Sequence, residues 1–136
     1  MIIRTLTPTF SVADQVTESD IDSLLSSGFK SVICNRPDEE GEPHLGQDAV
    51  KNALEAAGIE FRYLPVNGAA ITDLDVAEQA ALVNELPAPL LAYCRTGTRC
   101  TKLWALDPAR TDSADERIAA AAAAGINIED LRERIR

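Results

Sequence analysis

Short apolar runs separated by helical patterns make up most of the hydrophobic profile of this chain. The runs predict strands at residues 2–6, 10–13, 29–34, 61–66 and 90–93. After the second strand, the spacing of Ile21, Leu24 and Leu25 predicts a helix that carries all three on one face. A second helix is predicted over residues 47–57, directly before the fourth strand.

The second half of the chain continues this alternation. A third helix is predicted to begin at Thr72, whose hydroxyl can cap its first turn. Its apolar positions are Leu74, Ala77, Ala81 and Leu82. After the last strand, helices are predicted through residues 103–106 and over residues 113–124, followed by a short one capped by Asn127.

Alternating strands and helices predict an α/β fold with three layers, in which helices cover both faces of a mainly parallel sheet. The chain has 136 residues, of which 46% are hydrophobic and 26% are charged, as is ordinary for a globular domain. No segment reads as a linker, so a single domain over residues 1–136 is expected.

The net charge of −9 argues against nucleic acids and anionic membrane surfaces as partners, because both would repel the chain. No apolar run approaches the about 20 residues that span a bilayer, and the first residues lack the apolar region of a signal peptide. A cytoplasmic location is expected. The three cysteines form no disulfide framework and have no zinc-binding spacing, so neither a metal nor a cofactor is predicted.

The loop that follows the last strand carries the candidate chemistry. Cys94 begins this loop and Arg99 lies five places further on. The residues around them are Arg95, Thr96, Gly97, Thr98 and Cys100. Such a strand-to-helix loop turns backbone N–H groups toward a common centre at a helix N-terminus, which favours an anion. That anion is either the Cys94 thiolate or an oxyanion substrate.

The local charge supports an anion site. No acidic residue occurs between Glu85 and Asp107, whereas Arg95, Arg99 and Lys102 are all basic. A cationic pocket lowers the pKa of a thiol and attracts small anions. The alternative is a buried, inert cysteine beside two solvated arginines.

Two other strand ends offer residues that can face this loop. Asn35, Arg36 and Asp38 follow the third strand, and Asn67 follows the fourth. Loops at the carboxyl ends of parallel strands lie at the edge of the sheet where α/β proteins bind ligands. A solvated turn that only connects the elements is the alternative for the first group.

The spacing of Cys94 and Arg99, Cys-x4-Arg, resembles the loop of rhodanese-type sulfurtransferases and is one residue shorter than the Cys-x5-Arg loop of protein tyrosine phosphatases. Together with residues 32–40 and 61–66, it makes the chain similar to a small bacterial family with a dual-specificity-phosphatase-like fold. That family occurs alone or fused ahead of a persulfide dioxygenase domain. The resemblance implies a phosphatase-like fold, sulfur transfer or phosphatase-like chemistry, and a dioxygenase as a possible partner.

Sulfur transfer is the first functional hypothesis. Cys94 takes sulfur from a small anionic donor, such as thiosulfate or glutathione persulfide, holds it as a persulfide and passes it to a thiol or cyanide. Arg99 and Arg95 neutralise the leaving group. The alternatives are a cysteine-dependent phosphatase, in which Cys94 attacks phosphorus and Arg99 binds the phosphate, and a module that binds anions without turnover.

Three departures from the phosphatase pattern rank sulfur transfer first. The loop is tighter, and the position nearest the phosphatase general acid holds Asn67, whose amide cannot give up a proton. Cys100 stands where phosphatases place a hydroxyl after the loop arginine. Cys100 is therefore either a resolving partner for Cys94 or a small residue of the core.

Overall fold

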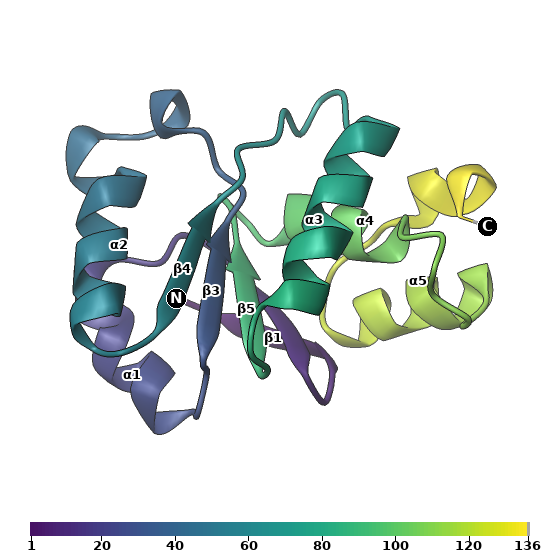
Figure 1. Ribbon diagram of the computed structural model, residues 1–136. Helices are drawn as coiled ribbons and strands as arrows, with labels where there is room; N and C mark the ends of the chain where they lie inside the picture. The colour runs from purple at the N-terminus through teal and green to yellow at the C-terminus, as the bar shows by residue number, and fades with distance from the viewer. Residues whose placement is uncertain (136) are drawn as a thin grey trace.

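The five apolar runs form one sheet, which is the middle layer of the molecule (Figure 1). The computed structural model describes residues 1–135, apart from the side chain of His44. The strands are β1 (Ile3–Thr7), β2 (Phe10–Ala13), β3 (Ser31–Cys34), β4 (Glu60–Tyr63) and β5 (Leu90–Tyr93). They lie in the order β1-β2-β5-β3-β4, with β1 antiparallel to β2 and the other pairs parallel. The prediction of a mainly parallel sheet is confirmed.

Helices cover both faces of the sheet, as the alternation of elements predicts (Figure 1). One face carries α1 (Ile21–Ser26) and α2 (Gln47–Ala56). The other carries α3 (Asp73–Glu85), α4 (Thr98–Ala105) and α5 (Ala114–Ala123). Short 3-10 segments occur at Glu18–Asp20, Asp38–Glu40, Pro43–Leu45 and Glu129–Arg134. The last of these is the short helix predicted after Asn127, whose side chain accepts a hydrogen bond from the Glu129 N–H.

Two apolar layers hold the helices onto the sheet. The layer beneath α1 and α2 includes Leu24, Leu54 and Leu91, all fully buried. The layer beneath α3, α4 and α5 includes Ile33 and Leu103. Each such side chain contributes about 1.5–3 kcal/mol when it is removed from water. The sheet therefore has a core on each face, which fixes the positions of the loops at its edges.

The helix α1 buries less than its pattern predicts. Ile21 and Leu24 are buried, but Leu25 is 44% exposed. The helix ends at Ser26 after six residues, so it is too short for a wide face to rest on the sheet.

The buried face of α3 also differs from the prediction. Leu74 is 66% exposed, and Ala77 and Ala81 are exposed as well. Leu82 is half-buried and packs against the core, as predicted, and the helix also buries Val76 and Gln79. Alanine offers little apolar area, so the alanines do not decide which side of the helix faces the sheet. The side that does so carries a glutamine, and this places a polar group in the interior.

The carboxyl ends of three strands meet at one edge of the sheet. Tyr93, the last residue of β5, pairs with Ala13 of β2 on one side and with Cys34 of β3 on the other. The next residues along the chain, Cys94 and Asn35, therefore leave the sheet side by side, and the Asn35 N–H donates to the Tyr93 carbonyl.

A buried arginine joins α5 to the segment that follows α4. The Arg117 side chain is 1% exposed, and its guanidinium donates to the backbone carbonyls of Ala105, Asp107, Arg110 and Asp112. It also pairs with the Asp112 carboxylate at 3.1 Å. A single side chain thus supplies hydrogen-bond donors to the backbone carbonyls of the irregular segment between α4 and α5.

We expect Arg117→Met to lower the free energy of unfolding by about 3 kcal/mol or more, because buried carbonyls and a carboxylate would lose their donor. The matched control is Arg62→Met, which removes a partly exposed arginine paired with Glu60 and should change stability by under about 1 kcal/mol. Urea unfolding followed by circular dichroism measures both. Equal losses in the two variants would contradict this role of Arg117.

Candidate active site

The loop between β5 and α4 owes its shape to one glycine. Gly97 is the residue before α4 and has a φ of +90°, in the left-handed region that side chains disfavour. This turn bends the chain back over Cys94 and starts the helix directly afterwards. Thr98 opens α4, so the helix begins earlier than the apolar pattern at residues 103–106 indicates.

The Cys94 sulfur lies at the centre of the turn. The Gly97 N–H donates to it at an N···S distance of 3.1 Å. The side chain of Cys100 and the N–H groups of Cys100, Thr96 and Gly97 stabilise its ionised form and lower the pKa of the Cys94 thiol to about 5, although burial opposes them. The first turn of α4 adds the positive end of its dipole. The structure therefore holds Cys94 as a thiolate.

A hollow of about 180 Å³ opens above this sulfur. It is lined by Gly68, Cys94, Arg95, Thr96, Thr98, Arg99 and Lys102. Cys94 itself is 1% exposed and thus forms the floor of the hollow. The three basic side chains and two hydroxyls on the walls suit a small anion.

Arg99 is held from three directions. Its Nη1 donates to the carbonyls of Asn35 at 3.2 Å and Val66 at 2.9 Å, and its Nη2 pairs with Glu40 at 3.0 Å. The Nε donor is buried and has no hydrogen-bond partner. A buried donor without a partner is costly, and an oxyanion bound in the hollow can supply the missing acceptor.

Gly68 lies in close contact with Arg99. A Cβ atom at position 68 would be 2.8 Å from Nε of Arg99, which is closer than real contacts allow. The guanidinium is tethered at its other nitrogens, so it has little freedom to move away. Glycine at this position lets the loop after β4 close one side of the hollow.

A buried polar network lies beneath the two cysteines. The Cys100 thiol donates to Oδ1 of Asn35 across 3.2 Å. Asn35 also exchanges two hydrogen bonds with Gln79 of α3, at 2.9 and 3.0 Å. Burial raises the pKa of the Cys100 thiol well above its usual value, and so does its hydrogen bond to Cys94. Cys100 therefore stays protonated beside an ionised Cys94.

Of the residues predicted around the loop, Asn35 reaches it and three others do not contact Cys94. Arg36 donates to Gln15 and to the Glu40 carbonyl, and Asp38 accepts from the Gln47 N–H at the start of α2. Asn67 is exposed and accepts from the Ala69 N–H. Arg36 lies near the site only through Glu40, which it approaches at 3.7 Å. The side chains of Arg36, Asp38 and Asn67 are used to shape their own loops.

Among the described residues, the carboxylate that meets the site is Glu40, bound to Arg99. Asp73 and Asp75 belong to the first turn of α3, where Asp75 takes part in a capping box with Thr72. Their acidic character is accounted for by that helix start. Neither is a lining residue of the hollow above Cys94.

The sequence interpretation missed Glu40, Gly68 and Gln79. Glu40 was one of several acids in a loop, and no pattern distinguished it from its neighbours. Gly68 follows Asn67 in a loop that the sequence did place near the site. A signal for Gln79 was available in principle, because a polar residue on the side of α3 that also holds Val76 is unusual in a buried face.

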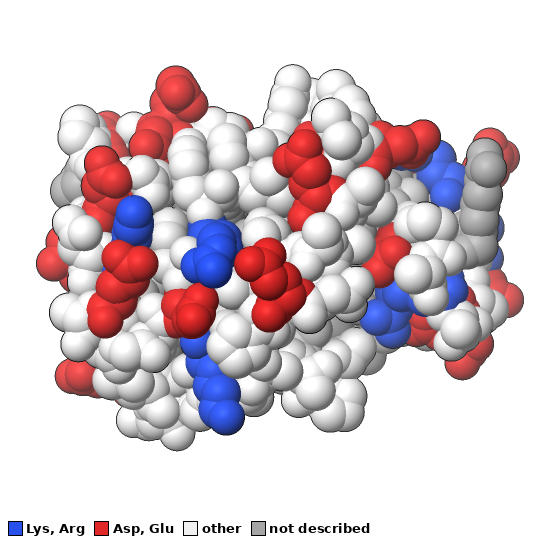
Figure 2. All heavy atoms as spheres, viewed as in Figure 1, with Lys and Arg blue, Asp and Glu red and all other residues white. Residues whose placement is uncertain are grey.

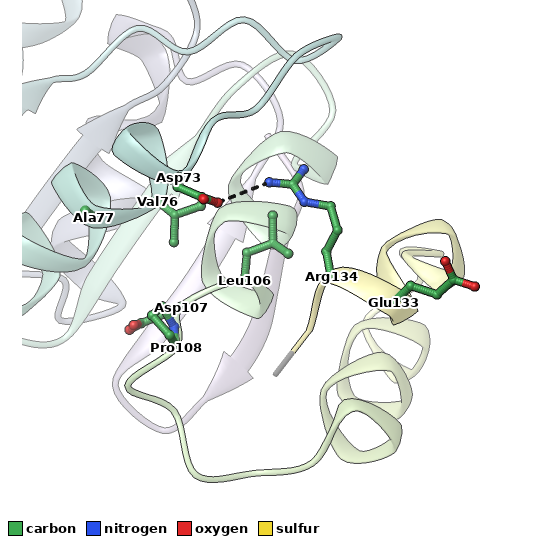
Figure 3. A pocket seen from close by; sticks show the side chains of 8 residues that line it. All are labelled: Asp73, Val76, Ala77, Leu106, Asp107, Pro108, Glu133 and Arg134. Atoms are coloured by element: carbon green, nitrogen blue, oxygen red, sulfur yellow. Dashed lines mark ion pairs between the residues drawn. The ribbon is translucent and has the colours of Figure 1, made fainter.

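A larger hollow of about 640 Å³ lies elsewhere, between the start of α3, the end of α4 and the C-terminal 3-10 segment (Figure 3). Its only arginine among the lining residues, Arg134, points toward Asp73 at 3.7 Å and also donates to the Ile71 carbonyl. No cysteine, serine or histidine is among the residues that line it. It therefore offers no thiol or hydroxyl nucleophile, and the small hollow above the ionised Cys94 is the candidate active site.

Figure 2 shows acidic side chains scattered over the visible face, with basic ones among them and no continuous basic patch on that face. The described residues contain no group of three or more His, Cys, Asp or Glu side chains that could hold a metal ion. Within the same residues, no helix is long and apolar enough to cross a membrane.

Comparisons with known proteins show what this chain is similar to. Residues 2–111 match the family described as "Beta-lactamase hydrolase-like protein, phosphatase-like domain". A beta-lactamase hydrolase-like protein of Agrobacterium fabrum is 37% identical over 98 residues, which are 72% of this chain and 23% of that protein. The crystal structure of a candidate phosphatase from Neisseria meningitidis is 40% identical, with a TM-score of 0.88 over 98% of this chain and 96% of that one.

The fold extends to more distant structures. PTPMT1 is 15% identical, with a TM-score of 0.74 over 98% of this chain and 90% of that chain. The phosphatase-like fold that the resemblance implied is thereby confirmed. This chain spans less than a quarter of the length of the curated relatives, at 23% and 22%.

We expect the rate of alkylation of Cys94 by iodoacetamide to rise through about pH 5 and to be constant at neutral pH, because only the thiolate reacts. In the urea-unfolded chain the same rise should occur near about pH 8.5. Mass spectrometry locates the modified residue, and Cys94→Ser provides the blank. A midpoint in the folded protein close to that of the unfolded chain would show that the loop does not hold a thiolate.

We expect Gly68→Ala to reduce affinity for anions in the hollow and to reduce turnover of any anionic substrate by about 10–100-fold, because the added methyl group displaces Nε of Arg99. Ala69→Ser, one residue further along the same exposed loop, is the matched control and should leave both nearly unchanged. Sulfate protection of Cys94 against alkylation measures the affinity. Full protection in the Gly68 variant would contradict the close contact.

Proposed function

Since this chain belongs to the family of phosphatase-like domains of beta-lactamase hydrolase-like proteins, we propose that it is a cysteine-dependent phosphatase. The observation that carries the proposal is the shared hollow above Cys94. Its floor is a thiolate, and its wall contains a buried arginine donor without a partner. A thiolate and an arginine with an unpaired donor, which both line one small space, suit a substrate with a phosphate group.

The reaction uses the atoms already described. The Cys94 sulfur attacks phosphorus, the bond to the leaving oxygen breaks, and a cysteinyl phosphate forms. Nε of Arg99 and the N–H groups at the start of α4 bind the phosphate oxygens and stabilise the charge that they carry in the transition state. Water then attacks phosphorus, which releases inorganic phosphate and restores the thiolate.

Proton supply limits the choice of substrate. In the described residues, Glu40 already binds Arg99, and Asn67 cannot donate a proton to a departing alkoxide. The site therefore favours phosphate compounds whose leaving group departs without help, such as aryl phosphates, acyl phosphates and phosphoanhydrides. Esters of simple alcohols are expected to be poor substrates.

Sulfur transfer is the second candidate, and the same lack of an acid favours it. The Cys94 thiolate attacks the outer sulfur of thiosulfate, the sulfur–sulfur bond breaks and sulfite departs with the electron pair, which leaves Cys94 as a persulfide. The persulfide then passes its outer sulfur to an acceptor thiolate. Sulfite and thiolates are good leaving groups, so no general acid is required. A persulfide dioxygenase remains a proposed partner for this reaction.

The two reactions and the non-catalytic alternative are separated by two incubations of the purified chain. With an aryl phosphate, we expect release of the phenol and its loss by about 10³-fold or more in Cys94→Ser. With thiosulfate, mass spectrometry tests for a gain of about 32 Da on Cys94, the mass of one sulfur atom. Arg99→Lys serves as a second variant that keeps the charge but loses the fixed Nε donor.

The outcomes are distinct. Phenol release without a sulfur adduct supports the phosphatase. A sulfur adduct with sulfite release and negligible phenol release overturns it in favour of sulfur transfer. If neither reaction occurs, while sulfate still protects Cys94 from alkylation, the chain is an anion-binding module and both enzymatic proposals fail.

A further inference from the structure

Gln79 is a buried polar residue for which the proposed reaction has no use. It lies on α3 with 2% of its surface exposed, and its amide faces Asn35 at the carboxyl end of β3. A buried amide is stable only if its polar groups form hydrogen bonds. Here the carbonyl oxygen and the NH2 group of Gln79 each form one with Asn35. The Asn35 side chain in turn is the contact of the Cys100 thiol.

The orientation of the Asn35 amide is determined by its neighbours. Its Nδ2 donates to the Leu64 carbonyl at 3.0 Å and to Oε1 of Gln79 at 2.9 Å. A backbone carbonyl can only accept, so the nitrogen must be on that side. Oδ1 therefore faces the other two groups, Nε2 of Gln79 at 3.0 Å and the Cys100 sulfur at 3.2 Å.

This arrangement matters because the Cys100 thiol has one hydrogen to donate and two neighbouring atoms that can accept it. One acceptor is Oδ1 of Asn35, and the other is the Cys94 sulfur. Since Gln79 already donates to Oδ1, that oxygen keeps a hydrogen bond when the Cys100 hydrogen turns away from it. Without Gln79, the same movement would leave a buried carbonyl oxygen without a donor, which is unfavourable.

We propose that Gln79 is a positioning residue for Cys94: by donating to Asn35, it frees the Cys100 hydrogen to bind the Cys94 sulfur. Gln79 thus acts on the reacting sulfur through two intervening side chains without contacting it. The inference rests on the proposed function only in that Cys94 is the nucleophile. The ionisation of Cys94 is measured without any substrate, so its failure and that of the phosphatase are distinguishable.

Other titratable and charged groups surround the two cysteines, among them Tyr93 of β5, which interacts electrostatically with Cys100. Cys34 of β3 disfavours ionisation of Cys100, as does the charge on Cys94, whereas Arg99 of α4 favours it. The remaining cations at the hollow are Arg95 in the loop and Lys102 of α4, and the latter pairs with Asp130 at 3.1 Å. Glu40 faces Arg99. Among the described residues, the Gln79 amide forms its hydrogen bonds with Asn35 and with none of these groups.

The test is a double-mutant cycle on the pH midpoint of Cys94 alkylation. Gln79→Met keeps the length of the side chain and removes both hydrogen bonds. We expect it to raise the midpoint by about one pH unit, so that alkylation below the midpoint becomes about tenfold slower. In a Cys100→Ala background, the midpoint is already raised and Gln79→Met should add nothing, because no thiol hydrogen remains to be redirected.

A purely structural role would give a different pattern. Val76→Ala, a buried truncation on the same helix with no polar contact, should lower the melting temperature and leave the midpoint unchanged. Equal shifts from Gln79→Met with and without Cys100 would overturn the proposal, as would no shift in either background. Infrared spectroscopy of the unaltered protein is an independent check, because the S–H band of Cys100 should shift as Cys94 ionises; a band that stays constant through that titration would also overturn it.

Discussion

The negative charge on the Cys94 sulfur is the feature on which the arrangement of the site depends. Burial disfavours this charge, so it exists only because donors surround the sulfur on the protein side. Those donors come from a left-handed turn at Gly97 and from the first residues of α4, in one short piece of chain. Their directions are fixed by the strand before them and the helix after them, both of which are anchored in the core.

Arg99 brings together segments that are far apart in the chain. Its contacts come from the end of β3, from the loop after β4 and from the acidic loop that contains Glu40. These segments meet because the parallel strands end at one edge of the sheet. Both Nη atoms of the guanidinium are engaged, and its Nε is a buried donor without a partner in a side chain that lines the hollow. An arginine held in this way binds an oxyanion with little loss of side-chain freedom.

The same hollow is compatible with phosphorus and with sulfur chemistry, because both reactions begin with attack by a thiolate on an anionic substrate. They differ in what the leaving group requires. A departing alkoxide needs a proton, whereas sulfite or a thiolate does not. Asn67 stands at the position nearest the phosphatase general acid, and the carboxylate of Glu40 is already ion-paired with Arg99. Family membership favours the phosphatase, and the acid–base chemistry restricts the leaving groups that it can handle.

The sequence by itself determined the elements and the reactive loop. Two local properties of the chain were sufficient: apolar runs of strand length, and the spacing of Cys94, Gly97 and Arg99. Local hydrogen bonding and burial decide what such segments form. The basic character of the loop could be read from the absence of acids between Glu85 and Asp107. The order of the predicted strands and helices, which is also read from local patterns, indicated an α/β fold.

Only the tertiary structure decided which distant residues complete the site. In α3 the apolar pattern pointed to Leu74 and the alanines, but packing against the sheet turned Gln79 inward to meet Asn35. Glu40 was selected from a run of acids only by its distance to Arg99. Which residues face the site depends on how whole helices and strands pack against one another. The conformational preference of one side chain within its own helix or loop is too weak to determine this.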